Sequence, residues 1–221
     1  MKKKLVLFGA REFAEVLAYY FIHDSAYELA AFTVDGAYME GDRFYDRPVV
    51  PFEELEERFP AEQHDLFVAI SYQKMNRIRA QKVAEAKAKG YGLAAFVSSK
   101  AQVWAGYQPQ ENSFVMEHNV VQPFSRIGRN SILWAGNHIG HHAIIGENCF
   151  LASHIVVSGM VRVGDFSFIG VNATLRDGIT IGQASLIGAG ALIMGDTQDE
   201  EVYVAEATKP RGISSSRLKG F

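Results

Sequence analysis

Histidine is the side chain best suited to proton transfer at neutral pH, and this sequence gathers most of its histidines in one segment. The stretch WAGNHIGHHAIIG contains His138, His141 and His142, and five of the seven histidines lie between His118 and His154. An imidazole with a pKa near neutrality can act as a general acid or base, and it is also a common metal ligand. Which role applies depends on which of these side chains face the same way.

A six-residue repeat runs through the second half of the chain and sets those directions. From Val97 to Ile193 every sixth residue is aliphatic, with Pro109 as the exception. Glycine often follows the aliphatic residue, at Gly128, Gly140, Gly146, Gly164, Gly170, Gly182 and Gly188. The fifth place is often small, as at Ser131, Ala143, Cys149, Ser167, Ala173, Ser185 and Ala191. This pattern predicts a hexapeptide β-helix, in which each unit forms one short strand and one corner.

In such a β-helix three units close one triangular coil, and the aliphatic residues stack along its axis. Burying each of these side chains stabilises the fold by roughly 1.5–3 kcal/mol. One coil alone leaves the stack half open, so several coils must pack on one another. We therefore expect residues that are eighteen apart in the sequence to lie directly above each other.

The fourth place of each unit is filled mostly by Asn, Gly or His. From the unit at Pro109 onward it holds Asn112, His118, Phe124, Asn130, Gly136, His142, Asn148, His154, Met160, Phe166, Asn172, Gly178, Ala184 and Gly190. Glycine adopts positive φ freely, and Asn and His are enriched there among other residues. We interpret His118, His142 and His154 as residues of left-handed corners. His138 and His141 occupy other places, face outward, and call for a chemical explanation.

The first half of the chain alternates between strand and helix patterns. Strands are predicted at residues 4–9, 28–34 and 65–70, and helices at residues 10–22, 51–59 and 73–90. Such alternation indicates a small parallel sheet covered by helices. We thus predict an α/β domain over residues 1–95, a β-helix over residues 96–196 and a C-terminal tail over residues 197–221.

A ligand of the N-terminal domain would lie at the carboxyl ends of its strands. Gly9, Asp35 and Ser71 fall at these ends and are our candidate contacts for a substrate. The stretch GAREFAE lacks the G-x-G-x-x-G fingerprint, so we expect no NAD site there. Asp35 with Gly36 also fits a simple turn, and both interpretations remain open at this point.

The bulk properties exclude several classes of protein. A net charge of −3 and a pI near 6.2 do not favour nucleic-acid binding, which usually shows a basic footprint. The apolar run after MKKK is too short for a signal peptide, and no stretch approaches the length of a membrane span. The single cysteine, Cys149, rules out an intramolecular disulfide and fits a reducing compartment. We expect a cytoplasmic protein without membrane insertion.

An α/β domain followed by a hexapeptide β-helix carrying HIGHHAIIG resembles the NeuD/PglD-like family of bacterial sugar acyltransferases. The resemblance covers nearly the whole chain. It implies a left-handed β-helix, a homotrimer, and acetyl-CoA as the acyl donor, with no metal. It also implies that the acceptor is an amino or hydroxyl group of a sugar, as a rule linked to a nucleotide, in the synthesis of surface polysaccharides and other glycans.

The resemblance also assigns roles to residues. His141 matches the family's catalytic histidine, a general base, and His142 stands where the family has a glutamate. His138 is a candidate helper. Gly159 lies one coil above His141, where the family places the amide that binds the thioester oxygen.

The remaining assignments concern the two substrates. Val171 and Ala189 match wall positions of the family's CoA groove, and Lys209 and Arg211 are candidates for binding CoA phosphates. Candidate acceptor contacts, besides those of the N-terminal domain, are Asn137 and His154. The chain departs from the family in its N-terminal loop, GAREFAEV, and in the end of its β-helix, VAEATKPRG.

Two other classes of protein remain open on sequence grounds. A γ-carbonic-anhydrase-like zinc enzyme is also a left-handed β-helix trimer, and His138 and His141 could contribute to its metal site; the N-terminal domain would then be unexplained. A non-catalytic β-solenoid scaffold would bind no CoA. The sequence leaves undecided whether the acceptor atom is nitrogen or oxygen.

Overall fold

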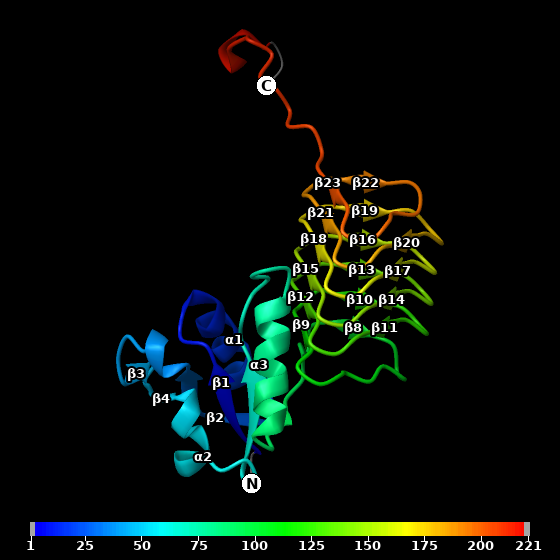
Figure 1. Cartoon of the computed structure of the whole chain (residues 1–221). Coiled ribbons are helices and arrows are strands. Elements are labelled where there is room, and N and C mark those ends of the chain that lie inside the picture. The colour runs from blue at the N-terminus through cyan, green and yellow to red at the C-terminus, as the bar shows by residue number, and fades with distance from the viewer. Residues whose placement is uncertain (1–2, 219–221) are drawn as a thin grey trace.

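The computed structural model describes residues 3–218 and consists of an α/β domain followed by a three-sided parallel β-helix (Figure 1). The fold class predicted from the sequence, a small α/β domain and a left-handed hexapeptide β-helix, is confirmed. No helix of the described residues is long and apolar enough to cross a membrane.

The N-terminal domain is built on a six-stranded sheet of order β3-β4-β2-β1-β5-β6. Its strands are β1 (Lys3–Phe8), β2 (Tyr27–Val34), β3 (Arg43–Phe44), β4 (Arg47–Pro51), β5 (His64–Val68) and β6 (Gly92–Leu93). Its helices are α1 (Glu12–His23), α2 (Leu55–Arg58) and α3 (Arg77–Ala88), with short 3-10 helices at Gly36–Tyr38 and Phe52–Glu54. The pairs are parallel except the β3–β4 hairpin at the sheet edge.

The two faces of this sheet are covered by different helices. On one face α1 buries Leu17 and Phe21 against side chains of β1, β2 and β5. On the other face residues of α2 and α3, among them Leu55 and Ala86, pack against the alternate side chains of the same strands. The first of these cores continues into the β-helix, since Phe114 belongs to the same buried cluster.

The β-helix consists of two-residue strands arranged in three sheets, which we call sheets I, II and III. Sheet I contains β7 (Phe96–Val97), β9 (Phe114–Val115), β12 (Ile132–Leu133), β15 (Phe150–Leu151), β18 (Phe168–Ile169), β21 (Leu186–Ile187) and β23 (Val202–Tyr203). Sheet II contains β8 (Gln102–Val103), β10 (Val120–Val121), β13 (His138–Ile139), β16 (Val156–Val157), β19 (Thr174–Leu175) and β22 (Leu192–Ile193). Sheet III contains β11 (Arg126–Ile127), β14 (Ile144–Ile145), β17 (Arg162–Val163) and β20 (Thr180–Ile181).

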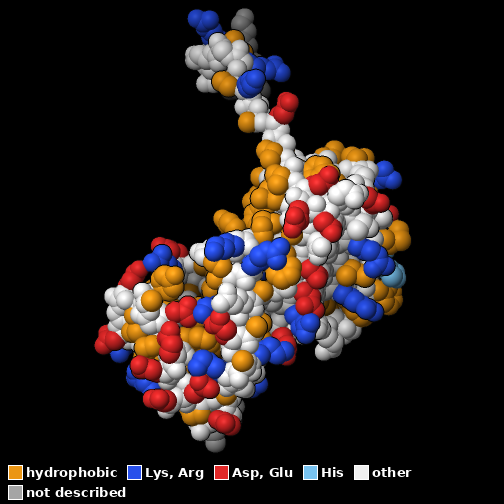
Figure 2. Space-filling model, in the orientation of Figure 1, with side chains coloured by type: hydrophobic (Ala, Val, Ile, Leu, Met, Phe, Trp, Pro, Cys, Tyr) orange, Lys and Arg blue, Asp and Glu red, His pale blue; other side chains and the backbone are white. Residues whose placement is uncertain are grey.

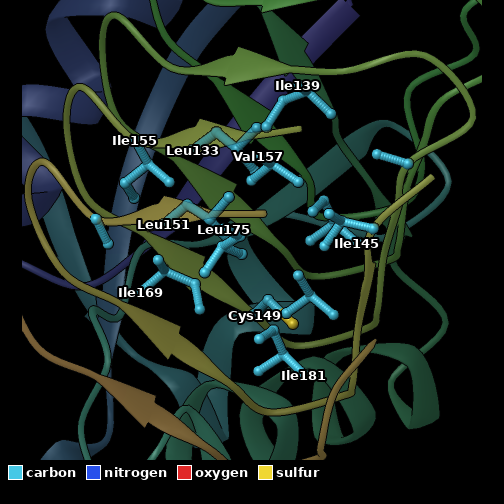
Figure 3. Packing of buried hydrophobic residues seen from close by; sticks show 14 of the residues in the cluster. Leu133, Ile139, Ile145, Cys149, Leu151, Ile155, Val157, Ile169, Leu175 and Ile181 are labelled. Carbon is cyan, nitrogen blue, oxygen red and sulfur yellow. The ribbon is translucent and has the colours of Figure 1, made fainter. Parts of the chain in front are cut away.

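The aliphatic place of the repeat forms the axis of the β-helix. Every such residue from Val115 to Ile193 is at most 5% exposed, and they stack in one cluster (Figure 3). Toward the N-terminal end the register is less buried, since Val103 is 37% exposed. The fully buried part of the β-helix core therefore begins at Val115.

The glycines that follow the aliphatic residues are needed for space rather than for an unusual backbone. A Cβ on Gly140 would lie 2.5 Å from the backbone nitrogen of Gly159, and one on Gly164 would lie 2.5 Å from that of Gln183. Neither glycine has a positive φ. A side chain at this place would collide with the backbone of the next coil.

The corners confirm the left-handed place of the repeat. All residues predicted for this place have positive φ, including Phe124 and Met160, which are rarely found in this conformation. His142, for example, has a φ of 58°. The repeat geometry thus imposes the left-handed conformation even where the residue type does not favour it.

The α/β domain is joined to the β-helix along sheet I and the corner between sheets III and I. At this corner Asn112, Asn130 and Asn148 form a ladder, in which each side-chain amide donates 2.8 Å to the Oδ1 of the next. Arg79 of α3 is fully buried against it and donates to the carbonyl oxygens of Asn130 and Cys149. Burial lowers the pKa of Arg79 to about 9, so the group stays protonated at neutral pH.

The ends of the β-helix extend slightly beyond the hexapeptide pattern. β23 pairs with β21 and adds a last strand to sheet I within the segment that we predicted as the tail. Beyond β23 the chain leads away from the β-helix and contains one short 3-10 helix, Ser215–Arg217 (Figure 1). Near this exit Figure 2 shows hydrophobic side chains at the surface, where Val202 is 65% exposed.

Arg79→Ala should lower the free energy of unfolding by about 3 kcal/mol or more, because it leaves several buried carbonyl oxygens without a donor. Urea denaturation measures the change. Gln81→Ala, an exposed position on the same helix, is the control and should change stability by less than about 0.5 kcal/mol. A similar stability for both variants would contradict the anchoring role of Arg79.

Candidate active site

The histidine pair of the HIGHHAIIG segment lies at the exposed corner between sheets II and III, where the chain passes from β13 to β14. The Nδ1 atoms of His141 and His142 are 3.2 Å apart. The backbone N–H of His141 donates 2.9 Å to the Oε1 of Gln122 in the coil below. These contacts hold the His141 ring with its Nδ1 toward His142 and leave Nε2 for another partner.

The Nδ1···Nδ1 contact constrains the protonation of the pair, because two neutral rings can share only one proton there. If the Nδ1–H of His141 donates to His142, the Nε2 of His141 carries a free lone pair and can accept a proton. His142 is fixed by its left-handed corner and by Phe124, whose ring centroid is 4.9 Å from its own. His142 can therefore orient His141 as an acceptor, in place of a carboxylate.

Directly above His141 the structure places Gly159, as the register predicts. The N–H of Met160 donates 2.8 Å to the carbonyl oxygen of His141, which locks the two coils together. A Cβ on Gly159 would lie 2.7 Å from the Nε2 of His141 and 2.8 Å from the Oδ1 of Asp177. Within residues 3–218 the N–H of Gly159 donates to no other group. An imidazole and a carboxylate therefore lie on either side of Gly159, whose amide is free, at this corner.

Asp177 was not among our candidates. It stands one coil above Gly159, at the same place of the repeat as His141. The signal was present in the sequence, because extending the eighteen-residue register by one more coil leads from His141 through Gly159 to Asp177.

Two other candidates from the same segment lie apart from this point. His138 projects outward from β13, is half-buried, and pairs in register with Val120 and Val156 on sheet II. Asn137 is 1% exposed; its Nδ2 donates 2.6 Å to the carbonyl oxygen of Trp134, and its Oδ1 accepts from a backbone N–H. The structure thus places Asn137 in the wall of the β-helix, with its amide already bonded, rather than facing a substrate.

Three more candidates lie at a different corner, between sheets I and II. His154 covers Gly136 there, since a Cβ on Gly136 would lie 2.8 Å from the His154 Nδ1. Val171 and Ala189 are exposed and occupy successive coils of the same corner. Lys209 lies in the extended segment beyond β23 (Figure 1). A single chain therefore does not bring these residues to His141.

The N-terminal domain contains a cavity of about 840 Å³ at the carboxyl ends of its strands. Gly9, Asp35 and Ser71 all line it, so the structure brings these three candidates together. Gly9 has a φ of +128°, and a Cβ on it would lie 2.8 Å from the carbonyl oxygen of Ala69. Only glycine fits this first loop, although the dinucleotide fingerprint is missing.

A half-buried lysine that sequence reasoning missed also lines this cavity. The Nζ of Lys82 is 2.7 Å from the Oδ1 of Asp35 and 2.7 Å from a carboxylate oxygen of Glu85. Burial opposes its charge, but the bonds to the two carboxylates outweigh this effect and raise the pKa of Lys82. Because Lys82 lies in a charged amphipathic helix, nothing in the sequence distinguishes it from its solvent-exposed neighbours.

Family models match the β-helix in two adjoining segments. Residues 124–159 match the bacterial transferase hexapeptide family (six repeats), and residues 160–194 match the hexapeptide repeat of succinyl-transferase. No curated protein sequence matches significantly. Among residues 3–218 no group of three or more His, Cys, Asp or Glu side chains is arranged to hold a metal ion.

Solved structures match nearly the whole chain. The acetyltransferase domain of PglB from Neisseria gonorrhoeae, solved with acetyl coenzyme A, is 27% identical with a TM-score of 0.80, covering 91% of this chain and 96% of that one. PerB from Caulobacter crescentus, solved with CoA and GDP-perosamine, is 25% identical with a TM-score of 0.79, covering 90% and 92%. WeeI from Acinetobacter baumannii, 19% identical with a TM-score of 0.70 and covering 91% and 96%, shares the fold.

The hexapeptide matches and the two-domain architecture define a hexapeptide-repeat acyltransferase. More particularly, the chain is similar over nearly its whole length to sugar acetyltransferases of the NeuD/PglD-like group.

Gly159→Ala should displace the His141 ring, because the added methyl carbon would lie within 3 Å of its Nε2. We expect the NMR resonances of the His141 imidazole to shift while the protein remains folded. The control is Gly195→Ala, where a Cβ meets nothing within 4 Å. Unchanged His141 resonances in Gly159→Ala would show that the ring does not cover Gly159 in solution.

Proposed function

We propose that this protein transfers an acetyl group from acetyl-CoA to an amino or hydroxyl group of a nucleotide-linked sugar, with His141 as the general base. The observation that carries the proposal is that the His141 Nε2 lies against Gly159, whose N–H is free within residues 3–218. Acyl transfer needs both groups, a base for the acceptor and a donor for the thioester oxygen. PglB and PerB, bound to acetyl-CoA or CoA in their solved structures, support the choice of donor.

His141 accepts the proton that the acceptor loses as it attacks the thioester carbon. The Nδ1–H of His141 would then donate to the Nδ1 of His142, which stabilises the imidazolium that forms. The Gly159 N–H donates to the carbonyl oxygen as negative charge develops on it. When the carbon–sulfur bond breaks, the imidazolium returns a proton to the departing thiolate, so that the products are the acetylated sugar and CoA thiol.

The sugar nucleotide would be held by the cavity of the N-terminal domain. Gly9 allows a ligand to approach the backbone, and Asp35 and Ser71 supply polar groups at the carboxyl ends of the strands. The neighbour PerB was solved with GDP-perosamine, a nucleotide-linked sugar. This role accounts for the N-terminal domain, which a carbonic-anhydrase-like enzyme or a scaffold would leave unexplained.

The complete site requires more than one copy of the chain. His141 lies at the corner between sheets II and III, whereas Val171, Ala189 and His154 lie at the corner between sheets I and II. A groove between two neighbouring copies can combine these corners, with Val171 and Ala189 as its wall, His154 toward the acceptor and Lys209 toward the CoA phosphates. We therefore propose that the protein is a homotrimer, with its acyl-transfer sites between subunits.

Sheet II is the face that we assign to the contact between copies. Its outward residues include Val156, which is 39% exposed, His138, and Leu192, which is 62% exposed. The N-terminal domain covers sheet I instead, so this apolar strip has no partner within residues 3–218. His138 would then lie in the contact and help to position His141 or the acceptor. Such an enzyme, with one buried thiol, fits a role in glycan synthesis in the cytoplasm.

Light scattering should give a molar mass three times that of the 24.5 kDa chain at micromolar concentration. Val156→Asp should shift the protein toward monomers, because it adds a charge to the contact. Val16→Asp, on α1 and similarly exposed, is the matched control and should leave the trimer intact. A monomeric wild-type protein would contradict a site shared between subunits.

His141→Ala should lower the turnover number by about 10²–10⁴-fold, the usual contribution of a positioned base. Binding of acetyl-CoA, measured by calorimetry, should change little, because the imidazole acts on the proton of the acceptor. His118→Asn is the control, since it replaces an exposed corner histidine by a residue that also tolerates positive φ. Near-normal turnover in His141→Ala would remove the proposed base.

The same preparations separate the two other classes of function. A zinc enzyme would contain stoichiometric metal in the purified protein and would lose activity with a chelator. A scaffold would show no change in melting temperature with acetyl-CoA, whereas a ligand that binds only the folded state raises it.

A further inference from the structure

The last part of the chain separates its acidic residues from its basic residues. Residues 177–206 contain six acidic residues and no Lys or Arg, whereas residues 207–221 contain four Lys or Arg and no acidic residue. Such asymmetry often marks a tail that takes part in an interaction. The acidic residues are Asp177, Asp196, Asp199, Glu200, Glu201 and Glu206, and the basic residues are Lys209, Arg211, Arg217 and Lys219.

The basic segment leaves the β-helix as an extended arm. The chain exits β23 at the corner between sheets I and II, where the N–H of Gly188 donates 2.7 Å to the carbonyl oxygen of Tyr203. Residues 205–218, which we call the C-terminal arm, then lead away from the β-helix (Figure 1). The hydrogen bonds that this arm forms within residues 3–218 join residues of the arm to each other. Its own chain therefore does not hold the arm in place.

The side chains of the arm are equipped for a contact. Ile213 is 56% exposed, and Leu218 is also exposed. Lys209, Arg211 and Arg217 are exposed, and none of them forms an ion pair among the residues that the structure describes. The arm thus combines unpaired cations with apolar side chains that lack a partner.

A complementary surface lies at the corner between sheets II and III, in the last two coils. Asp177 and Asp196 stand at this corner, and both are exposed without an ion pair in the described part of the chain. The Oδ1 of Asp196 accepts 2.8 Å from the Thr180 N–H, which holds the side chain but does not neutralise its charge. Beside it Met194 is 55% exposed. We call Asp177, Met194 and Asp196 the acidic corner.

The arm and the acidic corner of one chain lie on opposite sides of sheet II. In the proposed trimer a neighbouring copy covers sheet II, so the arm cannot cross this face of its own chain. The same arrangement sets the corner between sheets I and II of one copy beside the corner between sheets II and III of the next. The seven residues from Val204 to Arg211 span up to about 25 Å, whereas the six residues of one face span about 20 Å. The neighbour's acidic corner is therefore within reach.

We propose that the C-terminal arm docks on the acidic corner of a neighbouring copy, with Arg211 facing Asp196 and Ile213 lying on Met194. This inference rests on the proposed homotrimer and adds to it a contact outside sheet II. Each arm binds within a trimer that is already assembled, so a high effective concentration strengthens contacts that are weak one by one. Because Asp177 lies one coil above Gly159, the docked arm borders the proposed acyl-transfer site.

Cross-linking of a double variant shows which copy the arm binds. Pro210→Cys in the arm and Gly195→Cys beside Asp196 keep every charge, and a Cβ at Gly195 meets nothing within 4 Å. The native thiol of Cys149 is fully buried and does not compete. With a short bismaleimide we expect covalent dimers and trimers on a denaturing gel, whereas each single variant should run as a monomer. A link within one chain, found by mass spectrometry of the monomer band, would overturn the proposal, and so would the absence of any link.

Removing charges tests the recognition itself. Arg211→Gln/Arg217→Gln in the double-cysteine background should lower the yield of covalent dimers and trimers several-fold, and so should about 0.5 M NaCl, because salt screens exposed charges. The control is Arg126→Gln/Arg162→Gln, which changes two exposed arginines of sheet III that also form no ion pair within residues 3–218. The control should keep the full yield. An equal yield in both variants would contradict the pairing of the arm with the acidic corner.

Removal of residues 207–221 separates the arm from the rest of the assembly. The shortened chain should still form trimers through sheet II, but on dilution, followed by light scattering, it should dissociate at a concentration at least about tenfold higher. Equal dissociation of the full and shortened chains would overturn the proposal. A monomeric wild-type protein would overturn the proposed homotrimer and this inference together, whereas a wild-type trimer that gives none of these results would overturn the docking of the arm alone.

Discussion

The hydrogen bonds between successive coils of the β-helix are the interaction on which the rest of the structure depends. The N–H of His138 donates 2.9 Å to the carbonyl oxygen of Ile155, and that of Gly140 donates 2.8 Å to that of Val157. These bonds hold each residue above its equivalent eighteen positions earlier. A slip by one residue would turn the aliphatic axis outward and separate His141 from Gly159. The proposed catalytic geometry is therefore a consequence of the same register that forms the core.

The register also explains why the two proposed binding regions lie apart in one chain. The N-terminal domain is attached to sheet I and to the asparagine ladder by Arg79, which fixes its cavity on that side of the β-helix. His141 stands at the corner between sheets II and III, on another edge of the prism. In the proposed trimer, such an attachment would let a neighbouring copy present its sugar nucleotide without any movement between the domains of one chain.

The sequence predicted what depends on periodicity and failed on what depends on partners distant in the chain. The six-residue period of the sequence predicts the aliphatic axis of the β-helix, the left-handed corners and the stacking of His141 under Gly159. The β3–β4 hairpin was missed because its turn uses Tyr45 and Asp46 with positive φ, where no Asn-Gly or similar signal is present. The buried Arg79 looks like any other arginine of a charged helix, because its partners on the β-helix lie more than fifty residues away.

The candidate site shows the same division. Gly9, Asp35 and Ser71 could be grouped because the carboxyl ends of parallel strands share one edge, but the salt bridge of Asp35 with Lys82 required the packing of α3. Asn137 was chosen for its place beside the histidines, yet its amide is bonded within the wall. The residues beside Asn137 in the sequence do not predict these hydrogen bonds, because the bonds depend on how successive coils pair.

The central claim is that acyl transfer takes place over Gly159, and a crystal structure of the protein with acetyl-CoA tests it most directly. The account predicts the thioester carbonyl oxygen about 2.7–3.1 Å from the Gly159 nitrogen, with the His141 Nε2 facing the open side of the carbonyl carbon. A structure in which well-ordered acetyl-CoA lies at another corner of the β-helix, and the Gly159 amide contacts no thioester oxygen, would contradict this claim.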